Sequence, residues 1–357
     1  MTVFLVLIVI ILFAVTLWQM SKIYALSKGK SKDVSGEVAN DKDNSVNAKL
    51  MIMFTVFLYF LMFYCFWYYS KFYLPEASSE HGSKYDNLMF ISIALIMFVQ
   101  IITQFLLHFF SYKYKGEKGK RALFYADNDK LEFIWTIIPV IVLAGLIIYG
   151  LFTWSDIMNF EEDEDALVIE LYAQRFNWKA RYAGDDNTLG NANVRFIEGI
   201  NQVGIDPSDA DGQDDKVTQE LHLPVGRQVI FKLRSQDVLH SAYMPHFRAQ
   251  MNVVPGMITQ FSFTPTVTTE DIRTTDYMKE KMRTIQKIRN DRNKVLAAAG
   301  EPALDDYDEF DYYLLCNKIC GESHYNMQMK IIVESEEDYE AWIKQQETFK
   351  ASIADQE

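Results

Sequence analysis

Four long apolar stretches in the first half of the sequence constrain the fold of this chain more than any other feature. They cover residues 3–20, 50–69, 88–110 and 131–152. A helix needs about 20 apolar residues to cross a bilayer, and a backbone inside the bilayer must satisfy its own hydrogen bonds. The sequence therefore predicts four transmembrane helices. The first stretch lacks the basic start and small-residue cleavage site of a signal peptide, so we expect an uncleaved helix.

The loops between these stretches differ in their content of basic residues. Residues 21–49 and residues 111–130 carry six Lys or Arg each, whereas residues 71–87 carry two. Because cytoplasmic loops are enriched in Lys and Arg, the two basic loops are predicted to face the cytoplasm. We therefore expect a multi-pass protein of a plasma (inner) membrane, with both termini and all residues after 152 on the periplasmic side. A bacterial membrane is the simplest setting.

The net charge of the chain is −13. Such a balance excludes the broad basic surface that nucleic-acid binding requires. An acidic exterior instead suits a basic protein partner, or serves only solubility.

Beyond residue 166 the pattern changes to short β-rich segments separated by turns. The predicted strands are 167–172, 176–182, 217–223, 228–233, 258–263, 312–316 and 328–333. Short strands at this spacing are typical of a sandwich or a Greek-key barrel.

Residues 268–308 interrupt these strands. Their centre, residues 277–299, is rich in Lys and Arg and has apolar residues at roughly helical spacing, which predicts one or two inserted helices. Such an insertion either packs on the side of the barrel or offers a docking surface to a partner subunit. Ser335 is the predicted N-cap of a last helix, and the tail after Lys350 is expected to be frayed.

The stretch from Cys316 to Met327 places two thiols, an imidazole and a thioether within twelve residues. Cys and Met are soft ligands that suit Cu(I), and a thioether is a poor ligand for zinc. The stretch therefore predicts a copper site first and a zinc site second. A disulfide between Cys316 and Cys320 is the competing reading, which His324 and Met327 disfavour. Cys65 lies in an apolar run and is predicted to be a packing residue.

A metal at this loop needs a further imidazole from elsewhere in the chain. His240, in the segment 237–241, is our first candidate, and His246 and His222 compete with it. A lone His is more often structural than a ligand, but the incomplete donor set of the loop favours a ligand here.

Taken together, the motifs resemble subunit II of the haem–copper cytochrome c oxidases, over roughly residues 85–347. The motifs are LEFIWTIIP at 131–139, DVLHS at 237–241, VPG at 254–256 and the loop at 316–327. The resemblance implies membrane helices plus an all-β domain, with N-terminal transmembrane helices followed by a cupredoxin-like Greek-key β-barrel. The implied domains begin with two extra helices, each with its loop, at 1–49 and 50–87. A helix hairpin at 88–154, the outer domain at 155–348 and a tail at 349–357 follow.

In this family the outer domain carries a dinuclear copper centre, CuA. The resemblance implies two bridging thiolates, one imidazole for each copper, one thioether and one backbone carbonyl, supplied by Cys316, Cys320, His240, His324, Met327 and Lys318. It also implies that the centre accepts electrons from cytochrome c and passes them to haem in subunit I, where O₂ is reduced to water and protons are translocated. The implied partners are subunit I, which alone holds haem, other oxidase subunits, and cytochrome c or a cytochrome domain of a larger assembly.

Two departures from the family pattern lie near this centre. Lys318 stands where the family usually has a Glu that helps to hold Mg²⁺ at the border with subunit I. Gln250, Asn252 and Met257 also differ from the usual residues, so we expect the Mg²⁺ contact of this subunit to be missing or rebuilt. The family often has Trp-x-Trp as its electron-accepting motif. Here Phe176-Asn177-Trp178 occupies that place, which makes Phe176 and Trp178 the candidates for electron acceptance.

Glu132 begins the fourth apolar stretch and has two readings. A carboxylate at a helix N-terminus is stabilised by the helix dipole. The resemblance instead implies the mouth of a proton channel into subunit I.

The sequence leaves alternative functions open. These are a copper-free quinol-oxidase subunit, a membrane-anchored copper carrier or assembly factor, and a structural zinc loop. The complete donor set argues against the first, and the run 131–139 argues against the second. The two extra helices and the insertion are candidate contacts for subunits that simpler oxidases lack.

Overall fold

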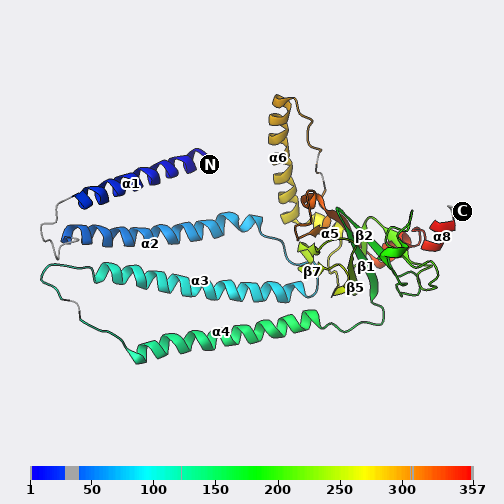
Figure 1. Cartoon of the computed structure of the whole chain (residues 1–357), viewed down its shortest axis with the longest axis horizontal. Coiled ribbons are helices and arrows are strands. Elements are labelled where there is room, and N and C mark those ends of the chain that lie inside the picture. Colours follow the sequence, from blue (N-terminus) through cyan, green and yellow to red (C-terminus); the bar gives the residue numbers. More distant parts are fainter. Residues whose placement is uncertain (1, 29–39, 122, 306, 308, 355–357) are drawn as a thin grey trace. The chain divides into compact units, whose positions relative to one another are not determined.

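The computed structural model (Figure 1) describes most of the chain, namely residues 2–28, 40–121, 123–305, 307 and 309–354. The chain divides into two compact units. The first unit comprises Met1–Phe66 and Val99–Asp127, and the second comprises Trp67–Phe98 and Asn128–Glu357.

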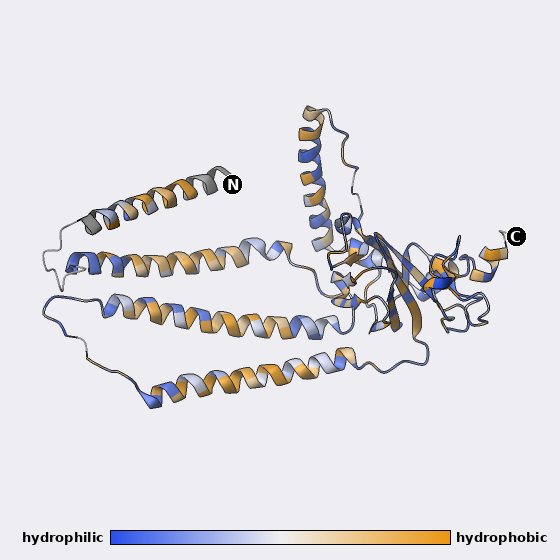
Figure 2. Cartoon of the chain, in the orientation of Figure 1, coloured by the Kyte–Doolittle hydropathy of each residue, from blue (hydrophilic) through white to orange (hydrophobic). Residues whose placement is uncertain are grey.

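Long helices fill the N-terminal part of the chain. They are α1 (Thr2–Lys28), α2 (Asp41–Tyr69), α3 (Gly82–Lys113) and α4 (Asp129–Met158). Within the described residues, three helical segments are long and apolar enough to cross a membrane: Asp41–Phe72, Gly82–Lys113 and Asp129–Met158. Apolar residues dominate the surfaces of these helices (Figure 2), as expected where lipid replaces water as the solvent.

The first predicted span is a helix, but its described apolar stretch runs only over Val9–Ser21. Its crossing of the membrane therefore stays a prediction. Helix α2 begins nine residues before the predicted apolar run, because Asn40 caps it through a 2.9 Å bond from the Asp43 amide. The middle of the predicted basic loop, residues 29–39, lies outside the described residues.

The outer domain is built from two five-stranded sheets. One sheet has the order β3-β2-β1-β5-β8, formed by Lys216–Thr218, Asn177–Tyr182, Leu167–Gln174, Val229–Ser235 and Thr259–Phe263. The other has the order β4-β10-β9-β6-β7, formed by Leu221–Pro224, Gln328–Glu334, Tyr312–Cys316, His240–Met244 and Ala249–Val253. The β1–β5 and β4–β10 pairs are parallel. Fully buried residues of both sheets, such as Ile169, Phe231 and Ile331, share one core, so the sheets pack as a sandwich. The prediction of membrane helices followed by an all-β domain is confirmed.

Two details of the strand prediction were wrong. The predicted strand 217–223 is two strands, β3 and β4, which belong to different sheets. The chain turns between them where the Thr218 hydroxyl donates to the Glu220 carbonyl at 2.7 Å. Strands β6 and β7 were not predicted, although β6 begins at the candidate ligand His240.

The insertion folds as predicted, into helices. Helices α5 (Thr269–Thr274) and α6 (Asp276–Ala299) follow one another, with Thr275 as the N-cap of α6. Gly300, at a φ of 74°, ends α6 in the left-handed conformation that favours glycine. Asp308, the last residue of the predicted insertion, lies outside the described residues.

The C-terminal part of the chain packs on the sandwich. Ser335 caps α7 (Glu336–Ile343) as predicted. The expected frayed tail is corrected, since residues Phe349–Ala354 form helix α8. Phe349 is buried in a small cluster with Tyr172 and Ile205, and that burial stabilises the last helix. Residues 355–357 lie outside the described residues.

Candidate metal centre

Strand pairing brings His240 to the loop of Cys316. Strand β6 begins at His240, β9 ends at Cys316, and Ala242 lies opposite Cys316 in the antiparallel ladder. The Asn317 amide donates to the Ser241 carbonyl at 3.1 Å and extends this pairing by one bond. As a result, the His240 Nδ1 atom lies 3.7 Å from Cys316 Sγ, although the residues are 76 positions apart.

The loop after β9 folds back on itself around two sulfur atoms. The Cys316 and Cys320 Sγ atoms are 3.9 Å apart, and the ligand atoms of both cysteines and His240 all lie within 4.8 Å of one another. The Lys318 carbonyl oxygen lies 3.2 Å from Cys316 Sγ. The Lys318 side chain is exposed, so this residue offers its backbone carbonyl and not its ammonium group to the centre.

Two further donors approach from the end of the loop. Cys320 Sγ lies 3.6 Å from His324 Nδ1 and 3.8 Å from Met327 Sδ. The Cys316 amide donates to the Met327 carbonyl at 3.0 Å, which closes the loop at the mouth of the β9–β10 hairpin. Met327 is buried, so the thioether faces inward, toward the sulfur atoms.

An aspartate fixes the orientation of the His240 ring. His240 Nε2 donates to Asp237 Oδ1 at 2.9 Å, which leaves Nδ1 as the nitrogen directed at the cysteines. The backbone amide and the Nε atom of Arg175 both donate to Asp237 Oδ2 at 3.0 Å. Burial opposes the charge on Asp237, but the hydrogen bonds from His240, Arg175 and the Val238 amide lower its pKa to about 2. The carboxylate therefore remains charged and holds the ring as an outer-shell partner of a ligand does.

The thiol of Cys320 holds its proton strongly when no metal is bound. Burial, followed by the charge and hydrogen bond of Cys316, raises the pKa of Cys320 to about 11. A bound cation lowers such a pKa because only the thiolate is a ligand.

The donor set fits copper better than zinc. The donors are two thiols, two imidazole nitrogens, a thioether and a carbonyl. Each lies 3.2 to 3.9 Å from at least one other donor of the set. Soft sulfur and imidazole ligands suit copper, and six donors exceed the four of a structural zinc site. The buried thioether has no role at zinc.

Comparison with known proteins agrees with this chemistry. The family model for the transmembrane domain of cytochrome c oxidase subunit II matches residues 68–152, and the model for its periplasmic domain matches residues 168–271. An alternative cytochrome c oxidase subunit 2 of Bradyrhizobium diazoefficiens is 34% identical over 240 residues, which are 67% of this chain and 71% of the relative. This chain belongs to the cytochrome c oxidase subunit II family.

More distant relatives span two classes of oxidase. Cytochrome c oxidase subunit 2 of Alkalihalophilus pseudofirmus is 24% identical and covers 73% of this chain and 57% of its own length. A probable quinol oxidase subunit 2 of Staphylococcus saprophyticus is 28% identical and covers 50% of this chain and 41% of its own. This subunit II is a membrane protein with an extracytoplasmic domain, and its match to the periplasmic-domain model ends before α6 and the metal loop.

Phe176 and Trp178 flank the centre in different ways. Trp178 is fully buried and makes a T-shaped contact with the His240 ring, with ring centroids 6.1 Å apart. Phe176 is half-buried, and its ring lies against Gly321, where an added Cβ atom would come within 2.7 Å of it. The sequence did not predict this contact, because it depends on how the metal loop folds over the β1–β2 turn.

Glu132 lies at the far end of the membrane hairpin from the metal loop. It occupies the exposed first turn of α4, which Asn128 caps by accepting from the Leu131 amide at 3.1 Å. At 1.5 Å per residue, α4 separates Glu132 from the outer domain by about 40 Å.

The two competing histidines have other partners. His222 Nδ1 lies 2.7 Å from Glu334 Oε1, and its ring stacks on Trp342 at 3.8 Å. His246 packs against Phe310 and Tyr312, and burial, with smaller contributions from Lys281 and Arg248, lowers its pKa to about 3. Neither joins the sulfur donors. Asp237 is the residue near the site whose role the sequence did not identify, and its position three residues before His240 was the available signal.

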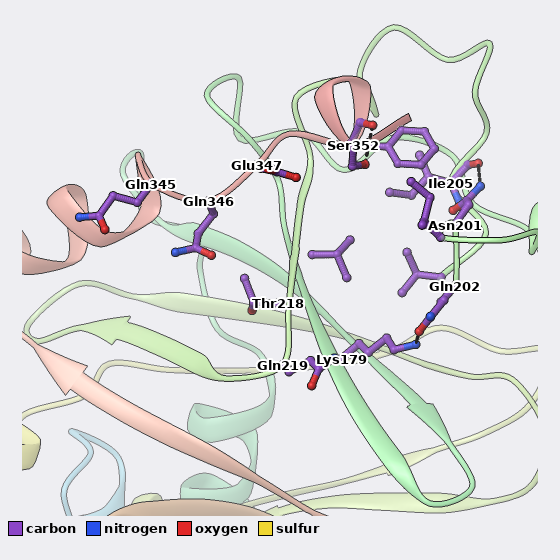
Figure 3. Close-up of a pocket in the computed structure, with 14 residues that line it drawn as sticks. Lys179, Asn201, Gln202, Ile205, Thr218, Gln219, Gln345, Gln346, Glu347 and Ser352 are labelled. Atoms are coloured by element: carbon purple, nitrogen blue, oxygen red, sulfur yellow. Dashed lines mark hydrogen bonds between the residues drawn. The ribbon is translucent and has the colours of Figure 1, made fainter. Parts of the chain in front are cut away.

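The candidate metal centre is a packed loop and not a substrate cleft. A hollow of 670 Å³ in the same domain is lined by residues of other segments, including Asn201, Gln219 and Gln346, and by none of the six donors. Lys179 points within it toward Gln202 (Figure 3). A centre embedded in this way suits the exchange of electrons better than the binding of a substrate.

Proposed function

We propose that this chain is the electron-accepting subunit of a respiratory cytochrome c oxidase. It accepts electrons from cytochrome c at a dinuclear copper centre and passes them to haem in subunit I, where O₂ is reduced to water with proton translocation. The observation that carries this proposal is the meeting of six donor atoms of the right chemistry on one loop and one strand.

Residues of this chain alone would hold the two metal ions. Cys316 and Cys320, as thiolates, and His240 and His324, through their ring nitrogens, would hold the two copper ions. When bound, the dinuclear centre supplies one-electron redox chemistry, shared over two metals. Met327 Sδ and the Lys318 carbonyl oxygen would complete the set as weaker ligands. Because the strand pairing holds the donors in place, we expect little rearrangement when an electron arrives.

The surroundings of the centre support docking of partner proteins. Leu239, Ile319 and Tyr325 each adjoin a donor residue in sequence, and all three are exposed. Exposed apolar side chains that gather at one site mark interaction surfaces. We assign this surface to contact with oxidase subunit I or with the cytochrome donor.

Four secondary assignments accompany this function. Phe176 and Trp178 are the proposed route of electron acceptance, since both adjoin the centre. Glu132 is the proposed proton-uptake carboxylate. The exposed ammonium of Lys318 replaces the usual carboxylate, so this subunit gives no side-chain contact to Mg²⁺ there. The proposed location is a bacterial plasma membrane with the copper domain outside.

Electron paramagnetic resonance of the full chain, loaded with copper in detergent, tests the proposal. We expect a mixed-valence dinuclear signal and two copper ions per chain by metal analysis. A mononuclear signal, or a chain that retains zinc in preference to copper, would contradict it. Absence of any copper binding would instead favour the quinol-oxidase class.

A further inference from the structure

Helix α6 is a basic element in an acidic chain. It carries seven Lys or Arg and three Asp or Glu residues within Asp276–Ala299, although the whole chain has a net charge of −13. In Figure 1 the helix extends away from the sandwich.

One face of α6 is occupied by its own domain. Met278 and Leu296 are buried on this face. The segment after Gly300 returns along the helix, where Asn293 exchanges hydrogen bonds of 2.7 and 3.1 Å with the backbone of Leu304. Arg289 donates to the Asp305 carbonyl at 2.6 Å. This face is therefore not available to a partner.

A second face of α6 begins at the membrane surface. Tyr277, Thr284, Ile288 and Val295 are spaced by seven, four and seven residues, so they form one line along the helix. The Tyr277 hydroxyl donates to the Tyr73 carbonyl, and Tyr73 lies four residues after the end of the membrane-spanning helix α2. This line of residues thus starts where the chain leaves the membrane.

Other contacts fix the outer domain to the same segment. Arg248 donates two bonds of 2.8 Å to the Asp86 carboxylate, in the first turns of α3. The Ser78 amide donates to the His246 carbonyl at 2.8 Å. Because these contacts lie within one compact unit, they hold the outer domain against the segment between α2 and α3.

The exposed residues of the second face match a lipid surface. Ile288 is 62% exposed and Val295 57% exposed, and Lys287 and Lys294 flank them on one side. Arg292 flanks them on the other side. Lys294 also pairs with Asp291 at 2.8 Å, but both partners are exposed, and such pairs are weak and easily exchanged. Apolar residues flanked by basic ones are characteristic of helices that lie in the membrane interface.

We propose that the Tyr277–Val295 face of α6 lies on the outer surface of the membrane and binds anionic phospholipid headgroups. Ile288 and Val295 enter the boundary of the acyl chains, while Lys287, Arg292 and Lys294 reach the phosphates. Tyr277 at the start of the helix adds an aromatic side chain at the level that such residues favour.

Photo-crosslinking in nanodiscs tests this placement. The full chain, in its oxidase complex, carries p-benzoylphenylalanine at Ile288 or, as the matched control, at Asn290, which is exposed on the opposite side of the helix. In discs that contain phosphatidylglycerol we expect lipid adducts at position 288 and few at position 290. Adducts of position 288 with another polypeptide would overturn the proposal and assign the face to a subunit interface. Equal adducts at both positions, or none at 288, would also overturn it. Val295 serves as a second reporter position if the Ile288 variant does not assemble.

A charge substitution tests the role of the basic flank. A Lys or Arg near an anionic surface strengthens binding roughly fivefold, so Arg292→Gln should lower the yield of phosphatidylglycerol adduct at position 288 by about that factor. Lys279→Gln, an equally conservative change at an exposed residue on another face, should leave the yield unchanged. An equal loss in both variants, or no loss in either, contradicts headgroup binding by this face.

Discussion

The metal loop and helix α6 are neighbours in the chain and differ in what holds them. The loop is fixed from both sides, by β6 through the β6–β9 ladder and by β10 through the hairpin, and its donors His240, Cys320 and Met327 are buried. Helix α6 is held at its first turn by Tyr73 and along one side by the segment that follows Gly300, and it leaves another face exposed. The loop thus presents its chemistry inward to a small ion, whereas α6 presents it outward to an extended surface. We expect changes in one region to leave the other unaffected.

The largest expected effect is the loss of the copper signal in Cys316→Ser. A hydroxyl cannot replace a bridging thiolate, so the dinuclear centre should be absent and electron transfer abolished. Metal analysis and paramagnetic resonance of the purified full chain measure this loss. Ile288→Ala on α6 is the control and should retain the full copper content. Copper loss in both variants would show that the two regions are coupled.

The next largest effect concerns the buried face of α6. Met278 is fully buried, so Met278→Ala should lower the free energy of unfolding of the outer domain by about 2–5 kcal/mol. Ile288→Ala, at an exposed position of the same helix, should change it by less than about 0.5 kcal/mol. Denaturant titration with near-ultraviolet circular dichroism distinguishes the two. If the losses were equal, the assignment of the two faces would be wrong.

Removal of the outer-shell carboxylate should weaken the centre without abolishing it. Asp237→Asn keeps the shape but loses the charge that orients His240, and such changes lower metal affinity roughly 10–100-fold. Competition with a copper chelator gives the affinity of each variant. Glu334→Gln, which alters the carboxylate beside His222 instead, should leave it unchanged. An affinity for Asp237→Asn equal to that of the native chain would exclude the orienting role.

A smaller effect is expected from lowering the pH, through protonation of the buried residue His246. The pKa of His246 is about 3 in the fold because of burial, Lys281 and Arg248, and about 6.5 in an unfolded chain. As the pH falls below 6.5, His246 therefore takes up a proton in the unfolded state before it does so in the folded state. Stability from this residue is complete above that pH and is lost progressively toward pH 3, by about 1.4 kcal/mol at pH 5.5.

Melting temperatures at pH 7.5 and 5.5 measure this loss. His246→Phe retains a ring among Phe310 and Tyr312 but has no proton to bind, so its melting temperature should fall less between the two pH values. An identical fall in both proteins would locate the acid sensitivity elsewhere.

The smallest expected change in the outer domain is that of Glu132→Gln, because Glu132 lies at the opposite end of α4. We expect slower turnover of the complex with an unaltered copper spectrum and unaltered α6 crosslinking. Asp129→Asn, in the same turn of the helix, is the control. Unchanged turnover in Glu132→Gln would leave the carboxylate with only its stabilising interaction with the helix dipole.

Local patterns made much of this molecule predictable. The apolar runs predict α2 to α4 because membrane solvation is a property of the segment alone. Cys316, Cys320, His324 and Met327 were found because they lie together in the sequence. By contrast, β6 and β7 are only five residues long, β7 is an edge strand that pairs with β6 alone among the described strands, and β6 joins the sheet by pairing with the distant strand β9. No local pattern encodes that long-range pairing. The same holds for the helix at Phe349, which is stabilised by burial against Tyr172.

The β6–β9 pairing joins residues that the ribosome synthesises far apart in time. His240 is synthesised 76 residues before Cys316, and the whole of α5 and α6 lies between them. A nascent chain therefore exports one imidazole ligand first, then the insertion, and every sulfur ligand last. On the proposed function, the donor set for copper is therefore complete only after the insertion and strand β9 have been synthesised. A chain that ends at Asp311 would carry a membrane anchor and His240, yet none of the three proposed sulfur ligands.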